Sequence, residues 1–261
     1  MSNSEELVVY WQPGCTSCLK VKEYLASRHV PFRSVNVLQD AQGMEQLARL
    51  GVRRVPIIAR GEQWCDAQTM ADINRIAGIA NPVTPSLSAQ ELGERVQGIL
   101  ELLTRYVRQI PEDQMLTMLP NRPRSYGGLA CHIAEIIDYF LRVVRHGHRL
   151  EFIDYDHPLP EALHDPANLH AYCDSVARLF EVWRTTEMPR ETMTRELELY
   201  YGQQPLQEFL ERSCWHAGQH LRQLELVLRL KIGVDPVVPL TPALFRGLPM
   251  PHAVWDDQLP F

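Results

Sequence analysis

Residues 7–19 read Leu7-Val8-Val9-Tyr10-Trp11-Gln12-Pro13-Gly14-Cys15-Thr16-Ser17-Cys18-Leu19. The first five side chains form a short apolar run that predicts a buried strand, and the Pro-Gly pair predicts a turn. The turn delivers the cysteine pair to the start of a helix, which we expect to run from Leu19 to Arg28. The order of strand, turn, cysteines and helix indicates an α/β fold for this part of the chain.

The position of the two cysteines predicts thiol chemistry. At a helix N-terminus the free backbone N–H groups and the helix dipole favour an anion, which lowers the pKa of a thiol. We therefore expect Cys15 to be a nucleophile, and Cys18, one turn further on, to attack a mixed disulfide formed on Cys15. The alternatives are half of a zinc site or two buried thiols. The sequence contains no second cysteine pair at zinc-finger spacing.

Strands alternate with short helices through the first domain, which we place at residues 1–80. Further strands are expected at 32–37, 55–59 and around Gln63-Trp64, and further helices at 42–50 and 66–77. The predicted order is βαβαββα. Two prolines and small polar residues then mark a linker at 81–87.

The first domain resembles a glutaredoxin, a thiol–disulfide oxidoreductase with the thioredoxin fold. The resemblance is carried by Tyr10 to Leu25, by Arg53-Arg54-Val55-Pro56 and by Trp64-Cys65-Asp66. It implies a cis Pro56 beside the cysteines, so that the Val55 backbone pairs with a bound peptide or glutathione. It also implies that Asp66 holds the γ-glutamyl end of glutathione. The sequence departs from the family at Thr16-Ser17, where Pro-Tyr is usual, and at Trp64-Cys65, where a glycine pair is common.

Beyond the linker the apolar residues recur at helical spacing. Long helices are expected at 89–110, 125–146, 168–186 and 205–230, and four helices over about 145 residues predict an antiparallel bundle at 88–232. Ser86 or Ser88 is the expected N-cap of the first helix. Residues 195–205 predict either a short hairpin arm or an extended cover. Six prolines predict an irregular tail at 233–261, wrapping over the bundle through Phe245, Trp255 and Phe261.

Two histidines of the last long helix predict a metal site. His216 and His220 lie four residues apart and project side by side. His132, in a similar apolar helical run, is the expected third ligand. Three neutral imidazoles suit zinc, nickel or ferrous iron and leave a position open for water or substrate, which indicates catalysis more than scaffolding. The alternative for each residue is an ordinary hydrogen-bonded core histidine.

The helical half resembles the DinB/YfiT-like family through Ser125 to Glu135 and through Trp215 to His220. That resemblance implies a divalent metal held by a histidine of the second helix and an HxxxH motif of the fourth. Some members use the metal to activate a low-molecular-weight thiol, because a thiol bound to a metal loses its proton. Glu135 is a candidate base or ligand-orienting residue. Gln219 and Arg222 are candidates for contacting an anionic substrate.

Composition narrows the classes of partner. Lysine and arginine number 26 against 32 acidic residues, for a formal charge of -6, and no basic block appears, so nucleic acid is excluded as a partner. The acidic start is unlike a signal peptide, and no apolar run is long enough to cross a membrane. Six cysteines with one close pair indicate a reducing compartment, so we expect a cytoplasmic protein.

The sequence therefore predicts a glutathione-linked thiol–disulfide oxidoreductase coupled to a metal-dependent thiol transferase or hydrolase centre. The expected cofactor is a divalent metal, zinc before nickel or iron. Glutathione or another low-molecular-weight thiol is the expected co-substrate, with a small electrophile or a mixed disulfide as its partner. The alternative is a redox- or metal-sensing binding protein without turnover. A homodimer that pairs through helix faces is a further expectation.

Overall fold

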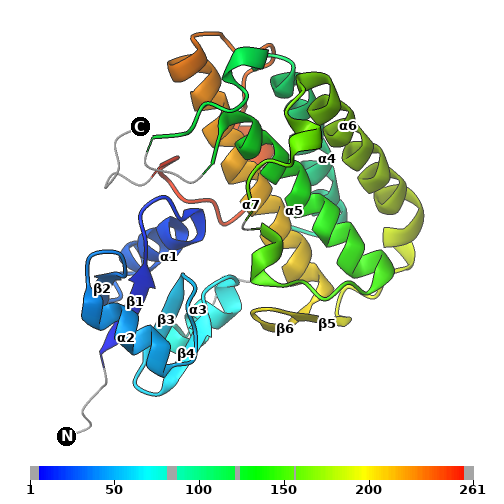
Figure 1. Cartoon of the computed structure of the whole chain (residues 1–261). Helices are drawn as coiled ribbons and strands as arrows, with labels where there is room; N and C mark the ends of the chain where they lie inside the picture. Colours follow the sequence, from blue (N-terminus) through cyan, green and yellow to red (C-terminus); the bar gives the residue numbers. More distant parts are fainter. Residues whose placement is uncertain (1–5, 81–86, 121–123, 156, 256–261) are drawn as a thin grey trace, which may run out of the picture. The chain divides into compact units, whose positions relative to one another are not determined.

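The computed structural model describes residues 6–80, 87–120, 124–155 and 157–255. These residues form two compact units, one made of 6–80 with 249–255 and the other of the described residues between 87 and 248. In Figure 1 the first unit is a small sheet with three helices, drawn blue to cyan, and the second is largely helical. Among the described residues, no helix combines the length and apolar character that crossing a membrane requires.

The first unit has a four-stranded sheet in the order β2-β1-β3-β4, in which β1 pairs parallel with β2 and antiparallel with β3. The strands are β1 Leu7–Trp11, β2 Arg33–Asn36, β3 Ile57–Arg60 and β4 Gln63–Asp66. The helices are α1 Thr16–Ser27, α2 Ala41–Arg49 and α3 Met70–Ala77. The predicted order βαβαββα and the thioredoxin-like α/β class are confirmed.

The sheet is covered on both faces, which explains why β1 is apolar throughout. Successive side chains of a strand point to opposite faces. Val9 packs into one core with Val21 of α1, and Val8 packs into a second core with Leu47 of α2. A strand buried on both faces reads as a continuous apolar run rather than an alternating one.

Two helix starts differ from the prediction. Helix α1 begins at Thr16 rather than Leu19, because Cys15 itself is the N-cap. Helix α3 begins at Met70 rather than Asp66, because Asp66 still pairs with Ile57 in the sheet. The Thr69 hydroxyl accepts the Asp72 N–H at 3.3 Å and caps α3, and such a side-chain cap is what a helix start requires.

The second unit contains the four long helices that the sequence predicted. They are α4 Ala89–Val107, α5 Tyr126–His146, α6 Pro166–Val182 and α7 Leu206–Val227, and α6 and α7 each continue into a π-helical turn, at Trp183–Glu187 and Leu228–Ile232. Short 3₁₀ turns lie at Glu112–Gln114, Phe152–Tyr155, Glu161–Leu163 and Met188–Arg190. Ser88 and Glu91 form a capping box at the start of α4.

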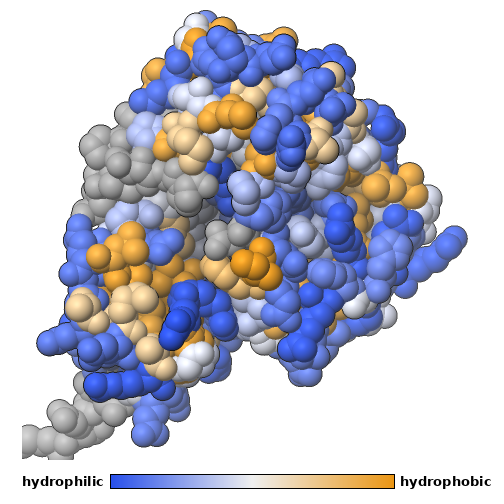
Figure 2. All heavy atoms as spheres, viewed as in Figure 1, coloured by the Kyte–Doolittle hydropathy of each residue, from blue (hydrophilic) through white to orange (hydrophobic). Residues whose placement is uncertain are grey.

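The helices of this unit enclose an aromatic core. Phe140 of α5 contacts the ring of Phe209 of α7, with centroids 5.1 Å apart, and the ring of Trp183 beyond α6, at 5.0 Å. Figure 2 shows a mostly polar surface over this unit, interrupted by small apolar spots. Burial of such rings and of the apolar helix stripes is the main force that holds the helices together.

Residues 195–205 form the hairpin rather than the extended cover. Strands β5 Glu196–Leu199 and β6 Gly202–Pro205 pair antiparallel, and Tyr200 and Tyr201 occupy the turn. Gly202 has φ 106, a conformation that favours glycine, at the point where the chain reverses.

The C-terminal tail divides between the two units. Within the helical unit a short helix, α8 Pro242–Phe245, interrupts the predicted irregular tail, and Phe245 packs on Gly218 of α7, which has no side chain to obstruct it. Residues 249–255 group instead with the first unit, where the Ala253 N–H donates to Glu23 at 3.0 Å. Trp255 belongs to the segment that groups with the first unit, and Phe261 lies outside the described residues.

Leu87 is the one residue of the predicted linker at 81–87 that the structure describes. Residues 81–86 lie outside the described residues. Leu87 is buried in the helical unit, and its carbonyl accepts a hydrogen bond from Gln207 of α7 at 2.9 Å.

Candidate redox site and candidate metal site

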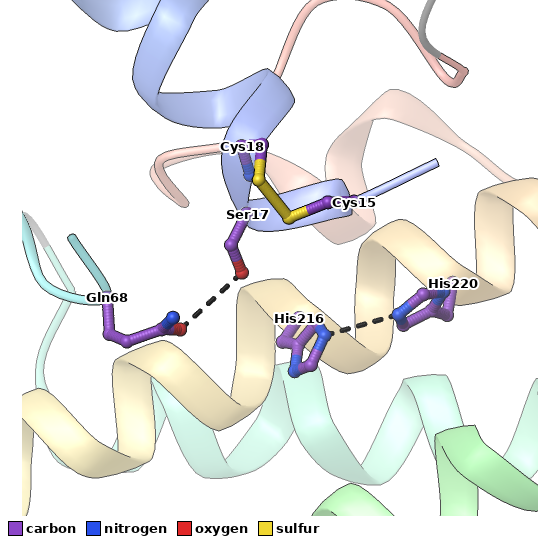
Figure 3. Close-up of a disulfide and its surroundings, with 6 residues drawn as sticks. All are labelled: Cys15, Ser17, Cys18, Gln68, His216 and His220. Atoms are coloured by element: carbon purple, nitrogen blue, oxygen red, sulfur yellow. Dashed lines mark hydrogen bonds between the residues drawn. A yellow bond between two sulfur atoms is a disulfide. The ribbon is translucent and has the colours of Figure 1, made fainter. Parts of the chain in front are cut away.

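The two cysteines of the first unit occupy different environments on one turn of α1. Cys15 is the N-cap with an extended backbone, and Cys18 is completely buried. A disulfide joins them, with their Cα atoms 5.2 Å apart (Figure 3). The Cys18 N–H donates to Cys15 Sγ at 3.2 Å. A backbone donor aimed at sulfur stabilises the thiolate over the thiol, which favours Cys15 as the attacking residue.

The Val55–Pro56 peptide bond is cis, as the resemblance implied. Pro56 is buried directly before β3, and its carbonyl accepts the Ala67 N–H at 3.1 Å. This hydrogen bond ties the loop of Val55 and Pro56 to the segment that follows β4.

Asp66 has a partner that the sequence did not reveal. Its buried carboxylate accepts hydrogen bonds from Arg54 Nε at 2.5 Å and from Arg54 Nη2 at 2.7 Å. Burial raises the pKa of Asp66, and the Arg54 guanidinium opposes that rise. A ligand ammonium at Asp66 would therefore share the carboxylate with Arg54.

Ser17, one of the departures from the glutaredoxin pattern, is also held in place. Its hydroxyl donates to Gln68 Oε1 at 3.5 Å (Figure 3). Lys20 Nζ donates to the Gln68 carbonyl at 3.1 Å. All three residues are buried. These contacts attach the first turn of α1 to the segment before α3. The spacing of the three residues along the chain did not predict them.

Comparison with known proteins agrees with this geometry. A family model described as glutaredoxin matches residues 7–64. The N-acetyl-S-hydroxy-L-cysteine reductase of Bacillus subtilis (strain 168) is 36% identical over 67 residues, which are 24% of this chain and 72% of that protein. An uncharacterized glutaredoxin-like 8.6 kDa protein in the rubredoxin operon of Clostridium pasteurianum is 39% identical over 51 residues, 19% of this chain and 68% of its own length.

The chain belongs to the glutaredoxin family. The family match ends at residue 64, before the helical unit begins. Membership supports a thiol–disulfide oxidoreductase function for the glutaredoxin domain, and it makes Cys15 and Cys18 its redox-active pair.

The helical unit, which follows the glutaredoxin domain, brings together the three histidines predicted as metal ligands. One ring nitrogen from each of His132, His216 and His220 lies within 4.8 Å of the others. The Nε2 atoms of His216 and His220 are 3.2 Å apart (Figure 3). All three side chains are buried, one on α5 and two on α7.

These positions fit a divalent metal. In a tetrahedral zinc site, nitrogen ligands at 2.0–2.1 Å from the ion stand about 3.3 Å from one another. The His216–His220 pair already has this spacing. The longest nitrogen–nitrogen separation exceeds it by at most about 1.5 Å, which a change in one side-chain dihedral angle covers. His132 Nδ1 is buried without a hydrogen-bond partner among the described residues, as a buried polar atom would be before it binds a ligand.

The imidazoles are held in the neutral form that metal binding requires. Burial, and then the positive charge of Arg124, hold the pKa of His132 well below its ordinary value. The same two causes lower the pKa of His220 to about 3. Near neutral pH both rings are therefore unprotonated, with a lone pair free for a metal.

Gln223 fixes the orientation of one ring. Its Oε1 lies 2.7 Å from His220 Nδ1, so Nδ1 carries the proton and Nε2 faces the other histidines. Gln223 was not predicted, although it lies three residues after His220 on the same helix face. Spacing of three or four residues on a helix was the signal that would have found it.

Glu135 and Gln219, which the sequence also proposed for this site, contact other side chains of the helical unit. Glu135 lies with Oε2 3.9 Å from His132 Nδ1, and its Oε1 is 3.3 Å from His157 Nε2 and accepts the Cys131 thiol. Burial raises the pKa of Glu135. Gln219 accepts a hydrogen bond from Arg222 at 2.7 Å.

Three further residues, Tyr155, Arg124 and Arg212, were not predicted. The ring of Tyr155 lies edge-on to His132 with centroids 5.8 Å apart. Arg212 donates to the Tyr155 hydroxyl, and Arg124 donates to the Tyr155 carbonyl. Arg212 lies 57 positions and Arg124 lies 31 positions from Tyr155 in the sequence. No local sequence pattern predicts contacts between residues so far apart.

Proposed function

We propose that the chain is a glutathione-linked thiol–disulfide oxidoreductase whose helical unit adds a metal-dependent thiol-transferase centre. The observation that carries the first part is the placement of Cys15 Sγ at the start of α1, facing the Cys18 N–H, in a glutaredoxin domain. The placement of three buried histidines around one point supports the second part.

The exchange reaction uses the two cysteines in turn. The Cys15 thiolate attacks a glutathione mixed disulfide, so a Cys15–glutathione disulfide forms and the other thiolate leaves. The Cys18 thiolate then attacks the Cys15 sulfur, which closes the intramolecular disulfide and releases glutathione as its thiolate. Two further thiol molecules reduce that disulfide and are themselves oxidised to a disulfide.

A sulfenic acid is a second candidate substrate, because the relative from B. subtilis is named as a reductase of an S-hydroxy-cysteine. Here the Cys15 thiolate would attack the substrate sulfur, and the hydroxyl group would leave as water after taking up a proton. Cys18 would then resolve the mixed disulfide as before and release the substrate thiol.

Arg54 and Asp66 together suit the γ-glutamyl end of glutathione, which carries both an ammonium and a carboxylate. The Asp66 carboxylate would receive the ammonium. Arg54 is 25% exposed, and its guanidinium would receive the carboxylate. The backbone of Val55, next to cis Pro56, would pair with the peptide part of the ligand.

In the helical unit His132, His216 and His220 would hold a divalent metal, zinc before nickel or iron. A metal bound there would lower the pKa of a coordinated thiol. The chain's own residues exclude water and orient the rings, since Gln223 holds His220 and Tyr155 packs against His132. The similarity of this half to DinB/YfiT-like proteins supports glutathione or a related thiol as the nucleophile and a small electrophile as its partner.

The redox half is tested by single cysteine variants in the reduction of a glutathione mixed disulfide. Cys15→Ser is expected to abolish turnover, whereas Cys18→Ser accumulates a glutathione adduct on Cys15 that mass spectrometry detects. Cys65→Ala is the matched control, because burial raises the pKa of that thiol to about 12 and keeps it unreactive near neutral pH. Full activity of Cys15→Ser would rule out the mechanism.

The metal half is tested by elemental analysis of the purified protein. Alanine at His132 is expected to lower the metal content sharply, and an unchanged content would show that the ligand set is wrong. Turnover of glutathione with an electrophile, abolished by a chelator, is expected for the enzyme. Metal binding without turnover would favour the sensing protein.

A further inference from the structure

Glu135 lies between the histidine cluster and a partly exposed histidine of the helical unit. Its Oε2 atom is 3.9 Å from Nδ1 of His132, and its Oε1 atom is 3.3 Å from Nε2 of His157. The side chain of Glu135 is 11% exposed, whereas that of His157 is 34% exposed. One buried carboxylate thus joins a proposed metal ligand to a residue that reaches solvent.

The Oε1 side of this carboxylate is held in place. Cys131, one helical turn before Glu135, donates its thiol to Oε1 at 3.3 Å. The His157 ring is engaged at both nitrogens. Its Nδ1 lies 3.0 Å from the Pro158 carbonyl, which can only accept a hydrogen bond, and its Nε2 faces Oε1. In the part of the chain that the structure describes, Oε2 makes no hydrogen bond, and its ion-pair contact is His132.

The same arrangement occurs at the other helix of the site. On α7, Gln223 lies three residues after His220, and its Oε1 is 2.7 Å from Nδ1 of that ring. On α5, Glu135 lies three residues after His132, and its Oε2 is the oxygen nearest to Nδ1 of that ring. Residues three apart are neighbours on the surface of a helix. Each ring therefore has an acceptor on its own helix, on its Nδ1 side.

Two roles are open to the buried Nδ1 of His132, which has no hydrogen-bond partner among the described residues. It binds the metal itself, or it donates to Glu135 while Nε2 binds the metal. The arrangement at His220 favours the second role, because there Gln223 takes Nδ1 and Nε2 faces His216. The separation of 3.9 Å exceeds a hydrogen bond by about 1 Å, which a change in one side-chain dihedral angle covers.

We infer that Glu135 positions His132 by accepting a hydrogen bond from Nδ1, so that Nε2 is the metal ligand, and that His157 positions Glu135. The carboxylate also places a negative charge beside three neutral ligands, which by themselves leave the charge of a divalent metal uncompensated. Both are positioning residues, because each acts on the metal through another side chain. This inference rests on the proposed function, since it specifies how the proposed ligand His132 is held.

The ring nitrogen of His132 is tested in the unaltered protein. The full chain with its Cys15–Cys18 disulfide intact is loaded with zinc, and NMR of isotope-labelled histidine nitrogens separates a protonated nitrogen from a metal-bound one. The His132 signals, assigned by their loss in His132→Gln, are expected to show the proton on Nδ1 and the metal on Nε2. Zinc bound to Nδ1 of His132 would overturn the inference and leave the metal site in place.

Variants of Glu135 separate orientation of the ring from packing. Glu135→Leu removes the acceptor and is expected to weaken cobalt(II) binding by about 10–100-fold, measured by competition with a chelator. Glu135→Gln keeps an acceptor oxygen, as Gln223 does for His220, and is expected to bind cobalt more tightly than Glu135→Leu. Equal cobalt affinity of Glu135→Leu and the unaltered protein would overturn the inference.

The role of His157 is tested by a double-mutant cycle. His157→Ala is expected to weaken cobalt binding less than Glu135→Leu does, because Cys131 still holds Oε1. In the double variant, His157→Ala is expected to add no further loss, because His157 acts only through Glu135. His146→Ala, at an exposed histidine in the last turn of α5, is the matched control and leaves the affinity unchanged. Losses that simply add would overturn the role of His157.

The outcomes distinguish this inference from the proposed function. Each contrary result above leaves a metal bound by the three histidines and removes only the positioning role. A full chain that binds neither zinc nor cobalt would instead overturn the proposed metal centre itself, and the inference with it.

Discussion

At the scale of single residues, the histidine cluster depends on neighbours that hold the rings as much as on the rings themselves. Gln223 holds Nδ1 of His220, so that Nε2 of the same ring faces His216. Cys15 is similar, because its sulfur accepts a hydrogen bond from the Cys18 N–H at 3.2 Å, and such a donor favours a thiolate. In both sites a hydrogen bond within one helical turn holds the side chain that is expected to react.

Gln223 is therefore expected to matter for metal affinity. Gln223→Leu removes the acceptor at His220 Nδ1, frees the ring to rotate, and is predicted to weaken metal binding by about 10–100-fold. Competition with a chelator of known affinity measures this change. Gln223→Glu keeps an acceptor at the same place and serves as the control. Equal affinity of Gln223→Leu and the unaltered protein would show that Gln223 does not orient the ring.

The buried histidines also predict a pH dependence of stability. His220 has a pKa of about 3 in the folded protein, against about 6.5 in an unfolded chain. Because the unfolded chain takes up the proton and the folded chain does not, stability falls as the pH drops below about 6.5 and continues to fall toward pH 3. Between pH 7 and pH 5 the loss from His220 amounts to about 2 kcal/mol.

Urea unfolding of the metal-free protein at the two pH values measures this loss. His220→Gln is the comparison, because it lacks the titrating ring and is expected to lose less stability over the same interval. An identical pH dependence in the two proteins would contradict the depressed pKa.

At the scale of elements, α5 and α7 carry the site, and the start of α5 is tightly constrained. Gly127 lies in the first turn of α5, where an added Cβ would stand 2.7 Å from Met115 Cε and 3.0 Å from the Met115 carbonyl. The backbone oxygen cannot move aside as a side-chain end can. This close packing fixes the position of the first turn of α5 against Met115, and thereby the position of His132 along the helix axis.

Gly127→Ala is therefore expected to destabilise the helical unit, by about 1–3 kcal/mol, as overpacking does. Gly98→Ala on α4 is the matched control, because its Cβ would meet only the flexible end of Leu244, and alanine favours a helix over glycine. Urea unfolding of both variants measures the difference. Equal or greater stability of Gly127→Ala would show that the start of α5 can shift.

At the scale of the whole molecule, the residues that position each site belong to a single unit. Ser17, Lys20 and Gln68 lie in the glutaredoxin domain with the cysteines, whereas Tyr155 and Gln223 lie in the helical unit with the histidines. Each site therefore has its own local support.

It follows that the two activities should be separable in the full chain. A chelator is expected to abolish thiol transfer to an electrophile and to leave mixed-disulfide reduction unchanged, because no histidine of the cluster takes part in that exchange. Cys15→Ser is expected to do the reverse. Parallel assays of both reactions measure this, and loss of both reactions on chelation would instead require that the metal supports the glutaredoxin domain.

The sequence by itself determined the elements and the identity of the chemical groups. The apolar run of β1, the turn before Cys15 and the HxxxH spacing of His216 and His220 are local patterns, and local hydrogen bonding and helical periodicity follow directly from spacing along the chain. The positions of the four long helices were predicted for the same reason. The exact start of α3 was not, because pairing of Asp66 with Ile57 extended β4.

Only the tertiary structure decided the partners of those groups. Arg54 binds Asp66, and Arg124 and Arg212 meet at Tyr155, through contacts between segments that the sequence holds apart. Such contacts depend on how helices and loops pack. A charged or aromatic side chain can interact equally well with many partners, and the fold decides which of them lies within reach. The sequence thus predicted two sites, and the fold determined the surroundings that set their chemistry.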